Sequence, residues 1–312
     1  MTIIDELSNQ RRLLLSVPLR PVQGKRFQPT GFPDLGAARF FGPDDEEHLL
    51  VESAQSVANR LEAVCWDPQN DTLRTPLDGL SYVRVEDESG ALVTSSVLEA
   101  HRLNSPRVLV GGFKAALEDK LGGKDAVADP RRLPPVLLEL DVGCLLHGVF
   151  LEKIAGLLRL PRALSGFVEA HGVRSAASGG VKNDHVDPTG DAKAGYGNVP
   201  FSREEFVAGE IVAYFNLDLV QVRDYGLGAD VERLLIALAL FKIRAFLDEG
   251  LRLRTACDLE PVGTVQVGST ELPSLSELEE TVQAAILPVR DRMHVNTVTY
   301  EPQAKKKKAK KS

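Results

Sequence analysis

The segment from about residue 229 to 248 most constrains the fold, because its side chains are apolar on nearly every side of a helix. Gly250 is placed to end this helix. The longest unbroken apolar run, Leu234–Phe241, is eight residues long, well below the ~18 that indicate a membrane span. Such a helix needs a core around it, and a chain of 312 residues can supply one. Disorder or a coiled coil along the whole chain is therefore not expected.

Strand and helix patterns alternate along the rest of the chain. Strands are predicted near residues 13–17, 49–51, 82–85, 136–140, 163–170, 211–219 and 295–300. Amphipathic helices with a capping serine are predicted at 53–66, 96–102, 105–121 and from 274 onward. Hydrophobic strands between well-formed helices favour an α+β fold, in which helices cover one face of a sheet. We expect residues 1–302 to form one interrupted domain.

Two segments differ in composition from this core. Residues 174–200 are rich in Gly, Ala, Asp and Asn, with almost no apolar periodicity. A structureless stretch of that length inside a domain tends to be functional or disordered. Residues 303–312 contain six lysines and are predicted to form a disordered tail. The net charge is −7, so the rest of the chain carries −13 and needs a local basic groove to bind nucleic acid.

The sequence lacks the common enzyme fingerprints. Gly122-Gly123-Lys124 does not have the spacing of a phosphate-binding loop, and Gly226-Leu227-Gly228 lacks the third glycine of a dinucleotide site. Asp184-His185-Val186-Asp187 offers metal-ligand types but is typical of a solvated polar turn. Three scattered cysteines indicate small core residues and a reducing cytoplasm. We therefore expect a cytoplasmic protein that is not an enzyme and has no metal or cofactor.

The loop from Arg20 to Gly36 carries the nucleic-acid features. Its basic, amide and aromatic side chains among glycines could hold a phosphate chain and its bases: Arg20, Gln23, Lys25, Arg26, Phe27 and Gln28. An ordinary connection with solvated basic residues explains the loop equally well. Three arginines after or near the end of the long helix could extend this surface, namely Arg244, Arg252 and Arg254. Gln55, Asn59 and Arg60 could join it from the first helix, although a solvated helix face is equally compatible.

Several long motifs are similar to one CRISPR-associated family. They are VPLRPVQGKRFQPTGFPDLG at 17–36, LVESAQSVANRLE at 50–62, LEAHRLNS at 98–105, SGGVKND at 178–184, AYFNLD at 213–218 and LRLRTACDLE at 251–260. The family is the RAMP-type backbone subunit of the type I-U (also called I-G) Cascade, the GSU-subtype member of the seventh Cas family. The resemblance covers essentially residues 11–265.

The resemblance implies an RRM-like, ferredoxin-type palm with long insertions and a protruding thumb, which we place at 174–200. It implies that copies of the chain stack along the guide RNA (crRNA) and present it to target DNA beside other Cascade subunits, away from membranes. By position, phosphate contacts fall on Arg20, Lys25 and Arg26, and close backbone approach falls on Gly24 and Gly31. The other RNA-binding candidates are Gln23, Gln55, Asn59, Arg60, Ser178, Gly179, Gly180, Lys182, Asn183, Arg252 and Arg254.

Aromatic residues make up 6% of the chain. This favours sequence-independent holding of the RNA backbone over the base stacking usual for an RRM sheet. Two enzymatic alternatives stay open. Asp34 in the first loop could help a metal cleave RNA, as in related backbone subunits. A nuclease that processes guide precursors would need a general acid and base, usually histidine, and the sequence places no histidine pair near the basic loops.

Overall fold

The computed structural model describes residues 3–32, 34–43, 45–123, 129–152, 154, 158–183, 185–186, 189–194 and 197–301. Its largest sheet has seven strands in the order β16-β17-β1-β15-β12-β5-β4, and every pairing in it is antiparallel. The strands are β1 (Arg12–Pro21), β4 (Arg39–Phe41), β5 (Glu47–Glu52), β12 (Leu164–His171), β15 (Glu210–Asp218), β16 (Arg252–Arg254) and β17 (Cys257–Pro261).

Strand β1 runs through the centre of this sheet. Its side chains alternate, so that Leu13, Leu15 and Val17 are buried while their neighbours face outward. The sequence predicted that the strand would give way to an irregular loop at Arg20; the irregular segment is present but begins two residues later, at Val22. Proline lacks an N–H donor, but its carbonyl group still accepts, and Pro18 O receives the N–H of Val262 at 2.8 Å. The strand therefore continues to Pro21.

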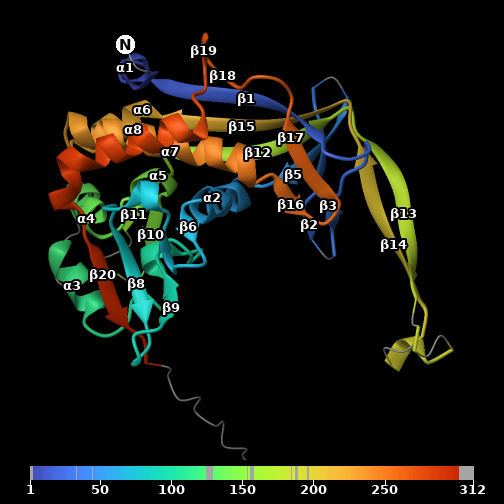
Figure 1. Cartoon of the computed structure of the whole chain (residues 1–312), viewed down its shortest axis with the longest axis horizontal. Coiled ribbons are helices and arrows are strands. Elements are labelled where there is room, and N and C mark those ends of the chain that lie inside the picture. The colour runs from blue at the N-terminus through green and yellow to red at the C-terminus, as the bar shows by residue number, and fades with distance from the viewer. Residues whose placement is uncertain are drawn as a thin grey trace, which may run out of the picture.

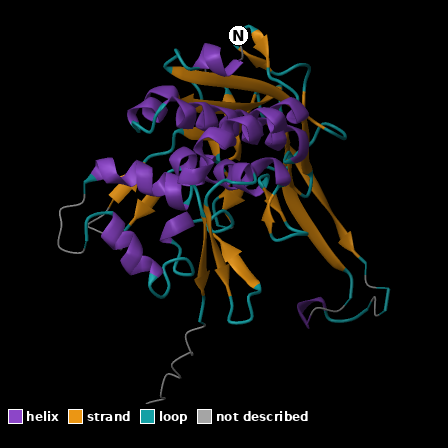
Figure 2. Ribbon diagram, turned by 60° about the vertical axis from the view of Figure 1, so that its left-hand side comes forward, coloured by secondary structure: helices purple, strands orange, loops and turns teal. Residues whose placement is uncertain are grey.

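The three long helices that the sequence predicted are present. They are α2 (Ala54–Ala63), capped by Ser53, α7 (Ala229–Glu249) and α8 (Leu275–Ile286), which has a full capping box from Ser274 and Glu277. Helix α7 is buried along most of its length. Gly250 ends it, and a Cβ there would lie 2.6 Å from the Phe246 ring. The helices form a layer beneath the large sheet (Figures 1 and 2), so the predicted α+β class is confirmed.

A second, smaller sheet lies on the other side of the helical layer (Figure 2). It contains β8 (Tyr82–Glu86) between β9 (Leu92–Ser95) and β20 (Val295–Thr299), and β20 runs parallel to β8. The remaining helices are α1 (Ile3–Leu7), α3 (Phe113–Lys120), α4 (Leu133–Leu140), α5 (Gly143–His147) and α6 (Leu219–Asp224). The short strands are β2 (Gly31–Phe32), β3 (Gly36–Ala37), β6 (Trp66–Asp67), β7 (Thr72–Leu73), β10 (Val149–Leu151), β11 (Leu158–Leu160), β18 (Gln266–Val267) and β19 (Thr270–Glu271).

Two predicted elements near the small sheet are wrong, and a third, predicted at 105–121, begins later than predicted. The apolar run at 136–140 belongs to helix α4, which prolines at its start help to initiate. The helix predicted at 96–102 is absent because Ser96 is buried and accepts the N–H of Val83 instead of capping. The helix predicted from Ser105 begins only at Phe113, after Gly111 takes a left-handed conformation (φ +53°).

The segment 174–200 is not structureless as predicted. Strands β13 (Arg174–Lys182) and β14 (Val199–Val207) form a hairpin with nine paired positions, from Arg174 opposite Val207 to Lys182 opposite Val199. The hairpin projects from one end of the large sheet (Figure 1). Most of its side chains are exposed on both faces, so its formation requires no apolar periodicity. The predicted tail, 303–312, lies outside the described residues.

Candidate nucleic-acid interface

The basic loop is attached to the base of the projecting hairpin. Phe27 and Phe206 exchange both backbone hydrogen bonds at 2.9 Å, and their ring centroids lie 6.5 Å apart. The Arg39 guanidinium lies 4.7 Å above the Phe206 ring. Phe27 is only 1% exposed, so the expectation that it offers a face to RNA bases is wrong. Its ring instead fixes the loop against the hairpin.

The other side of the loop rests on the β16–β17 turn. The N–H of Val22 donates to Asp258 O at 3.0 Å, and the N–H of Gln28 donates to Ala256 O at 2.8 Å. Between these contacts Gly24 takes φ +68°, a left-handed conformation that favours glycine. The chain thus turns sharply at Gly24 while both of its sides are held.

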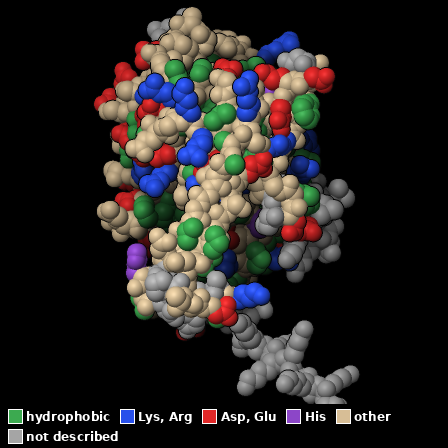
Figure 3. Space-filling model, turned by 90° about the vertical axis from the view of Figure 1, so that its right-hand side faces the viewer, with side chains coloured by type: hydrophobic (Ala, Val, Ile, Leu, Met, Phe, Trp, Pro, Cys, Tyr) green, Lys and Arg blue, Asp and Glu red, His purple; other side chains and the backbone are tan. Residues whose placement is uncertain are grey.

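A hollow of about 520 Å³ opens where the loop, the β16–β17 turn and the hairpin base meet. We call it the basic hollow. It is lined by Pro21, Val22, Gln23, Gly24, Lys25, Arg26, Arg203, Glu205, Arg252, Arg254, Thr255, Ala256 and Asp258. The structure thus brings together six predicted residues and adds Arg203 from β14, which sequence reasoning missed. On the face that carries the hairpin, Lys and Arg side chains alternate with acidic ones (Figure 3), so positive charge is local there.

The basic hollow has more cations than anions. Arg26 and Arg203 share the buried carboxylate of Glu205, at 3.3 and 2.5 Å. Lys25 and Arg252 are exposed, and neither forms an ion pair with a carboxylate in the described part of the chain. These two side chains are therefore the ones best able to meet phosphate oxygens without first breaking an existing contact.

Two predicted arginines instead hold the fold together. Arg254 pairs with the buried Glu52 and also donates to Gln28 O at 3.0 Å and Val51 O at 3.1 Å. Arg60 lies 3.5 Å from the same carboxylate and donates to Leu253 O at 2.5 Å. Their guanidinium groups join β5, β16 and the loop, although Arg60 Nε is buried without a hydrogen-bond partner among the described residues.

Other predicted residues lie away from the basic hollow. Arg20 pairs with Glu260 across the sheet at 2.7 Å, and Gln55 lines a different hollow. Asn59 is exposed on α2, and Arg244 pairs with Asp248 one helical turn away. Gly31 has a structural role, since a Cβ there would lie 2.7 Å from Gly36 O in the β2–β3 pairing. The expectation that Gly31 serves close approach of RNA therefore lacks support.

The predicted hairpin residues all fall on or beside β13. Lys182 and Asn183 are exposed, whereas Ser178 is half-buried. A Cβ at Gly179 would lie 2.6 Å from Phe201 O, whereas one at Gly180 would make ordinary contact with the Phe201 ring. Gly179 thus permits close pairing with β14. Asp184 and Asp187 lie outside the described residues.

A row of rings crosses the open face of the large sheet, and sequence reasoning missed it. The Phe167 and Tyr214 rings lie 5.2 Å apart, and Tyr214 Oη lies 3.2 Å from His171 Nε2. His171 Nδ1 lies 2.8 Å from His48 Nδ1, and the ring centroids of His48 and Phe40 lie 5.3 Å apart. The sequence carried a signal for this row, because alternate positions of β12 point away from the core.

Asp34 is exposed in the β2–β3 turn, and no three potential metal ligands gather within the described residues.

The fold and site define an α+β protein with a basic hollow at the base of a projecting hairpin. The chain belongs to the family described as CRISPR-associated protein GSU0053, whose profile matches residues 13–175, just over half of its length. The family membership predicted from the motifs is thus confirmed. No curated protein matches the chain.

Two solved structures show limited likeness to the chain. One is a chain of the structure described as "CRISPR RNA-guided surveillance complex, pre-nicking", with 19% identity and a TM-score of 0.44 over 80% of this chain and 73% of that one. The other is Csc2 from Thermofilum pendens, with 10% identity and a TM-score of 0.33 over 93% and 78%. Neither likeness is high enough to define the fold or function. Within the described residues no helix is long and apolar enough to cross a membrane.

Proposed function

We propose that this chain is the guide-RNA-binding backbone subunit of a type I CRISPR interference complex (Cascade). Several copies stack along the spacer of the crRNA and present it for pairing with target DNA, in contact with other Cascade subunits. The observation that carries this proposal is the basic hollow, in which Lys25 and Arg252, without a carboxylate partner among the described residues, lie at the base of the hairpin. Membership in a CRISPR-associated family supports the proposed role in a CRISPR complex.

The strand order supports an RRM-like palm. The central strands lie in the order β17-β1-β15-β12, helix α2 comes between β1 and β12 in the chain, and helix α7 comes between β15 and β17. This is the βαββαβ arrangement of a ferredoxin-like sheet, with its strands ordered 4-1-3-2. The β13–β14 hairpin extends the connection between the second and third of these strands, the place we propose for the thumb.

The composition of the basic hollow supports sequence-independent holding of RNA. Its described lining offers ammonium and guanidinium groups, an amide and backbone, but no aromatic ring. Such groups contact phosphates, which position a strand without reading its bases. A subunit that must accept any spacer needs this property.

We further propose that the chain is not a nuclease. One observation favours the alternative, since His48, His171 and Tyr214 are linked on the open sheet face and histidine pairs can act as general acid and base on RNA. Incubating the RNA-bound protein with labelled RNA, with Mg²⁺ or with chelator, separates the possibilities. Cleavage lost in His48→Ala/His171→Ala supports a processing nuclease, and Mg²⁺-dependent cleavage lost in Asp34→Ala supports a metal-dependent one.

The proposed function is tested by assembly on guides of different length. The protein is produced with crRNAs whose spacers are shortened or lengthened, and copies per RNA are counted by native mass spectrometry. We expect the copy number to rise in steps with spacer length, and nuclease protection to show a regular repeat. One copy per RNA at every spacer length would overturn the proposal.

A further inference from the structure

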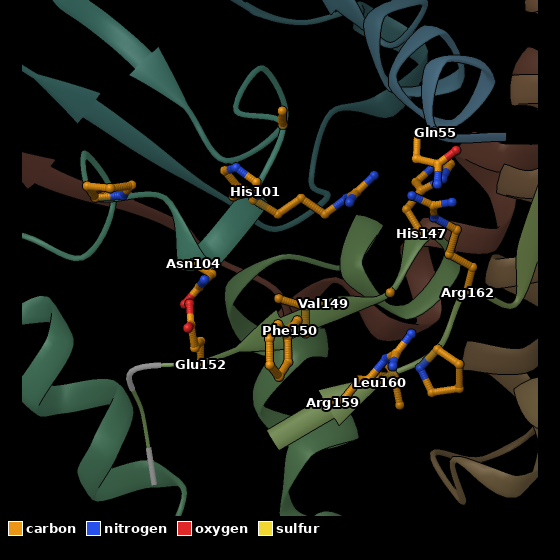
Figure 4. A pocket seen from close by; sticks show the side chains of 15 residues that line it. Gln55, His101, Asn104, His147, Val149, Phe150, Glu152, Arg159, Leu160 and Arg162 are labelled. Atoms are coloured by element: carbon orange, nitrogen blue, oxygen red, sulfur yellow. The ribbon is translucent and has the colours of Figure 1, made fainter. Parts of the chain in front are cut away.

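A second hollow, distinct from the basic hollow, lies between helix α2, the 3₁₀ turn Arg102–Asn104 and the β10–β11 hairpin. It has a volume of about 640 Å³. Eight polar side chains line it, namely Gln55, His101, Arg102, Asn104, His147, Glu152, Arg159 and Arg162. Figure 4 shows Gln55, His147 and Arg162 close together on one side and Arg159 below them.

Backbone packing fixes the side of the hollow that His147 and Arg162 form. Gly148 takes φ +73°, and a Cβ there would lie 2.6 Å from Leu160 O and 3.0 Å from Arg162 N. Only glycine therefore lets the 160–162 segment approach the residue that follows His147. The N–H of Ala163 donates to Leu146 O at 2.9 Å and fixes the same register. These contacts place Arg162 beside His147.

The protonation of His147 follows from its partner. Lys242 Nζ lies 2.9 Å from His147 Nε2, and an ammonium group has donors only. Nε2 must therefore accept, and the proton of the neutral ring lies on Nδ1. Burial, reinforced by the charge of Lys242, lowers the pKa of His147 well below its usual value, so the ring stays neutral. Nδ1–H is thus a donor on a side chain that is 1% exposed, and it has no hydrogen-bond partner among the described residues.

The charge around this donor is positive. Arg102 donates to Glu62 in a buried pair, while Arg159 and Arg162 form no ion pair with a carboxylate in the described part of the chain. Burial and the nearby Arg102 lower the pKa of Arg162, as expected where guanidinium groups crowd together. Among the described lining residues Glu152 is the one acidic side chain.

The hollow also offers amides. Gln55 projects from the first turn of α2, a turn without acidic side chains. The amide of Asn104, whose Oδ1 has no hydrogen-bond partner in the described part of the chain, can present its NH₂ group after rotation by 180°. Donors thus converge from α2, the 3₁₀ turn, α5 and β11. A planar carboxylate accepts within one plane, whereas the tetrahedral oxygens of phosphate can meet donors from several directions.

We propose that this second hollow binds a phosphate group, with the His147 Nδ1–H, Arg159 and Arg162 as its principal donors. The proposed site lies outside the basic hollow, so its failure would leave the proposed function standing, although it includes Gln55, which the family resemblance assigns to RNA. The phosphate can belong to an RNA backbone, to an RNA 5′ end or to a small phosphate ester. All three share the chemistry of a phosphate oxygen accepting from buried or crowded N–H groups.

Calorimetric titration of the full chain with inorganic phosphate, at constant ionic strength, tests the proposal. We expect saturable binding at one site, and a loss of about tenfold or more in Arg162→Gln or Arg159→Gln, the effect of one charge-assisted hydrogen bond. Arg131→Gln, an exposed arginine elsewhere, is the matched control and should bind as the wild type does. Lys25→Ala/Arg252→Ala should also keep its phosphate affinity, whether or not it still binds RNA. No saturable binding, or equal binding in Arg162→Gln, would overturn the proposal.

Two further measurements make the test specific. Long-range ¹H–¹⁵N NMR of His147 should show the Nδ1-protonated ring, with a shift of Nδ1–H when phosphate is added, whereas an Nε2-protonated ring would contradict the proposal. Acetate that competes as well as phosphate would also contradict it, because it would assign the hollow to a carboxylate. Short RNAs with and without a 5′ phosphate then distinguish the sources. If RNAs with and without a 5′ phosphate both compete, the hollow binds a backbone phosphate. If only the RNA with a 5′ phosphate competes, the hollow binds a 5′ end. If neither RNA competes, the ligand is a small phosphate ester.

Discussion

Replacing Lys25 and Arg252 together by alanine tests the basic hollow most directly. Both side chains are exposed there without a carboxylate partner in the described structure, so each can contact one phosphate. For a single strand, each lost contact lowers the slope of log affinity against log salt by about 0.7. The double variant should therefore lose about 1.4 units of slope, equally for unrelated RNA sequences.

A control of the same charge is available elsewhere on the chain. Arg12 pairs with Asp218 at 3.1 Å and Arg131 with Asp129 at 3.0 Å, both outside the basic hollow. Arg12→Ala/Arg131→Ala removes two positive charges as well, but it should leave the slope nearly unchanged. Fluorescence anisotropy of labelled RNA across a salt series measures both variants. Equal losses of salt slope in the two double variants would show that only net charge matters. An unchanged slope in Lys25→Ala/Arg252→Ala would show that the basic hollow does not contact RNA.

Three other outcomes are expected. Gly179→Val should speed amide exchange along the hairpin but leave the core unfolding temperature unchanged, because its side chain would clash with Phe201 O; Gly180→Ala, with ordinary contacts, is the control. Since the unfolded chain protonates His147 below about pH 6.5 and the folded chain does not, the free energy of unfolding in urea should fall with decreasing pH by up to about 1.4 kcal/mol per unit. His147→Gln should flatten this dependence, and an unchanged slope would contradict it. Deleting residues 303–312 should weaken RNA binding only at low salt, as gel shifts can show, and failure of guide assembly would contradict this.

The parts of the fold that depend on local pattern could be predicted from the sequence. Helix α7 is apolar nearly all round, and α8 carries its own capping box, so both were predicted near their observed bounds. The apolar segment of α4 was read as a strand, because eight residues are too few to distinguish the two periods. The β13–β14 hairpin was missed because exposed strands need no apolar alternation.

The candidate site was predictable only in part. The sequence indicated the basic loop and the arginines near residue 252, and the fold brings them together with Arg203. It could not show that Phe27 faces the core or that Arg254 is occupied by backbone carbonyl groups, because both depend on segments distant in the chain. The neutral tautomer of His147 likewise depends on Lys242, 95 residues away.

The parallel pairing of β20 with β8 has a consequence for synthesis on the ribosome. Val83 and Val85 of β8 are fully buried in the finished protein, and β8 lies between β9 and β20. Roughly 200 residues separate the two paired strands, so at ~5–20 residues per second β8 waits on the order of 10–40 s for its partner. During that time one edge of β8 is open to pairing with other chains. Slow translation of the later segments should therefore increase aggregation of the nascent chain.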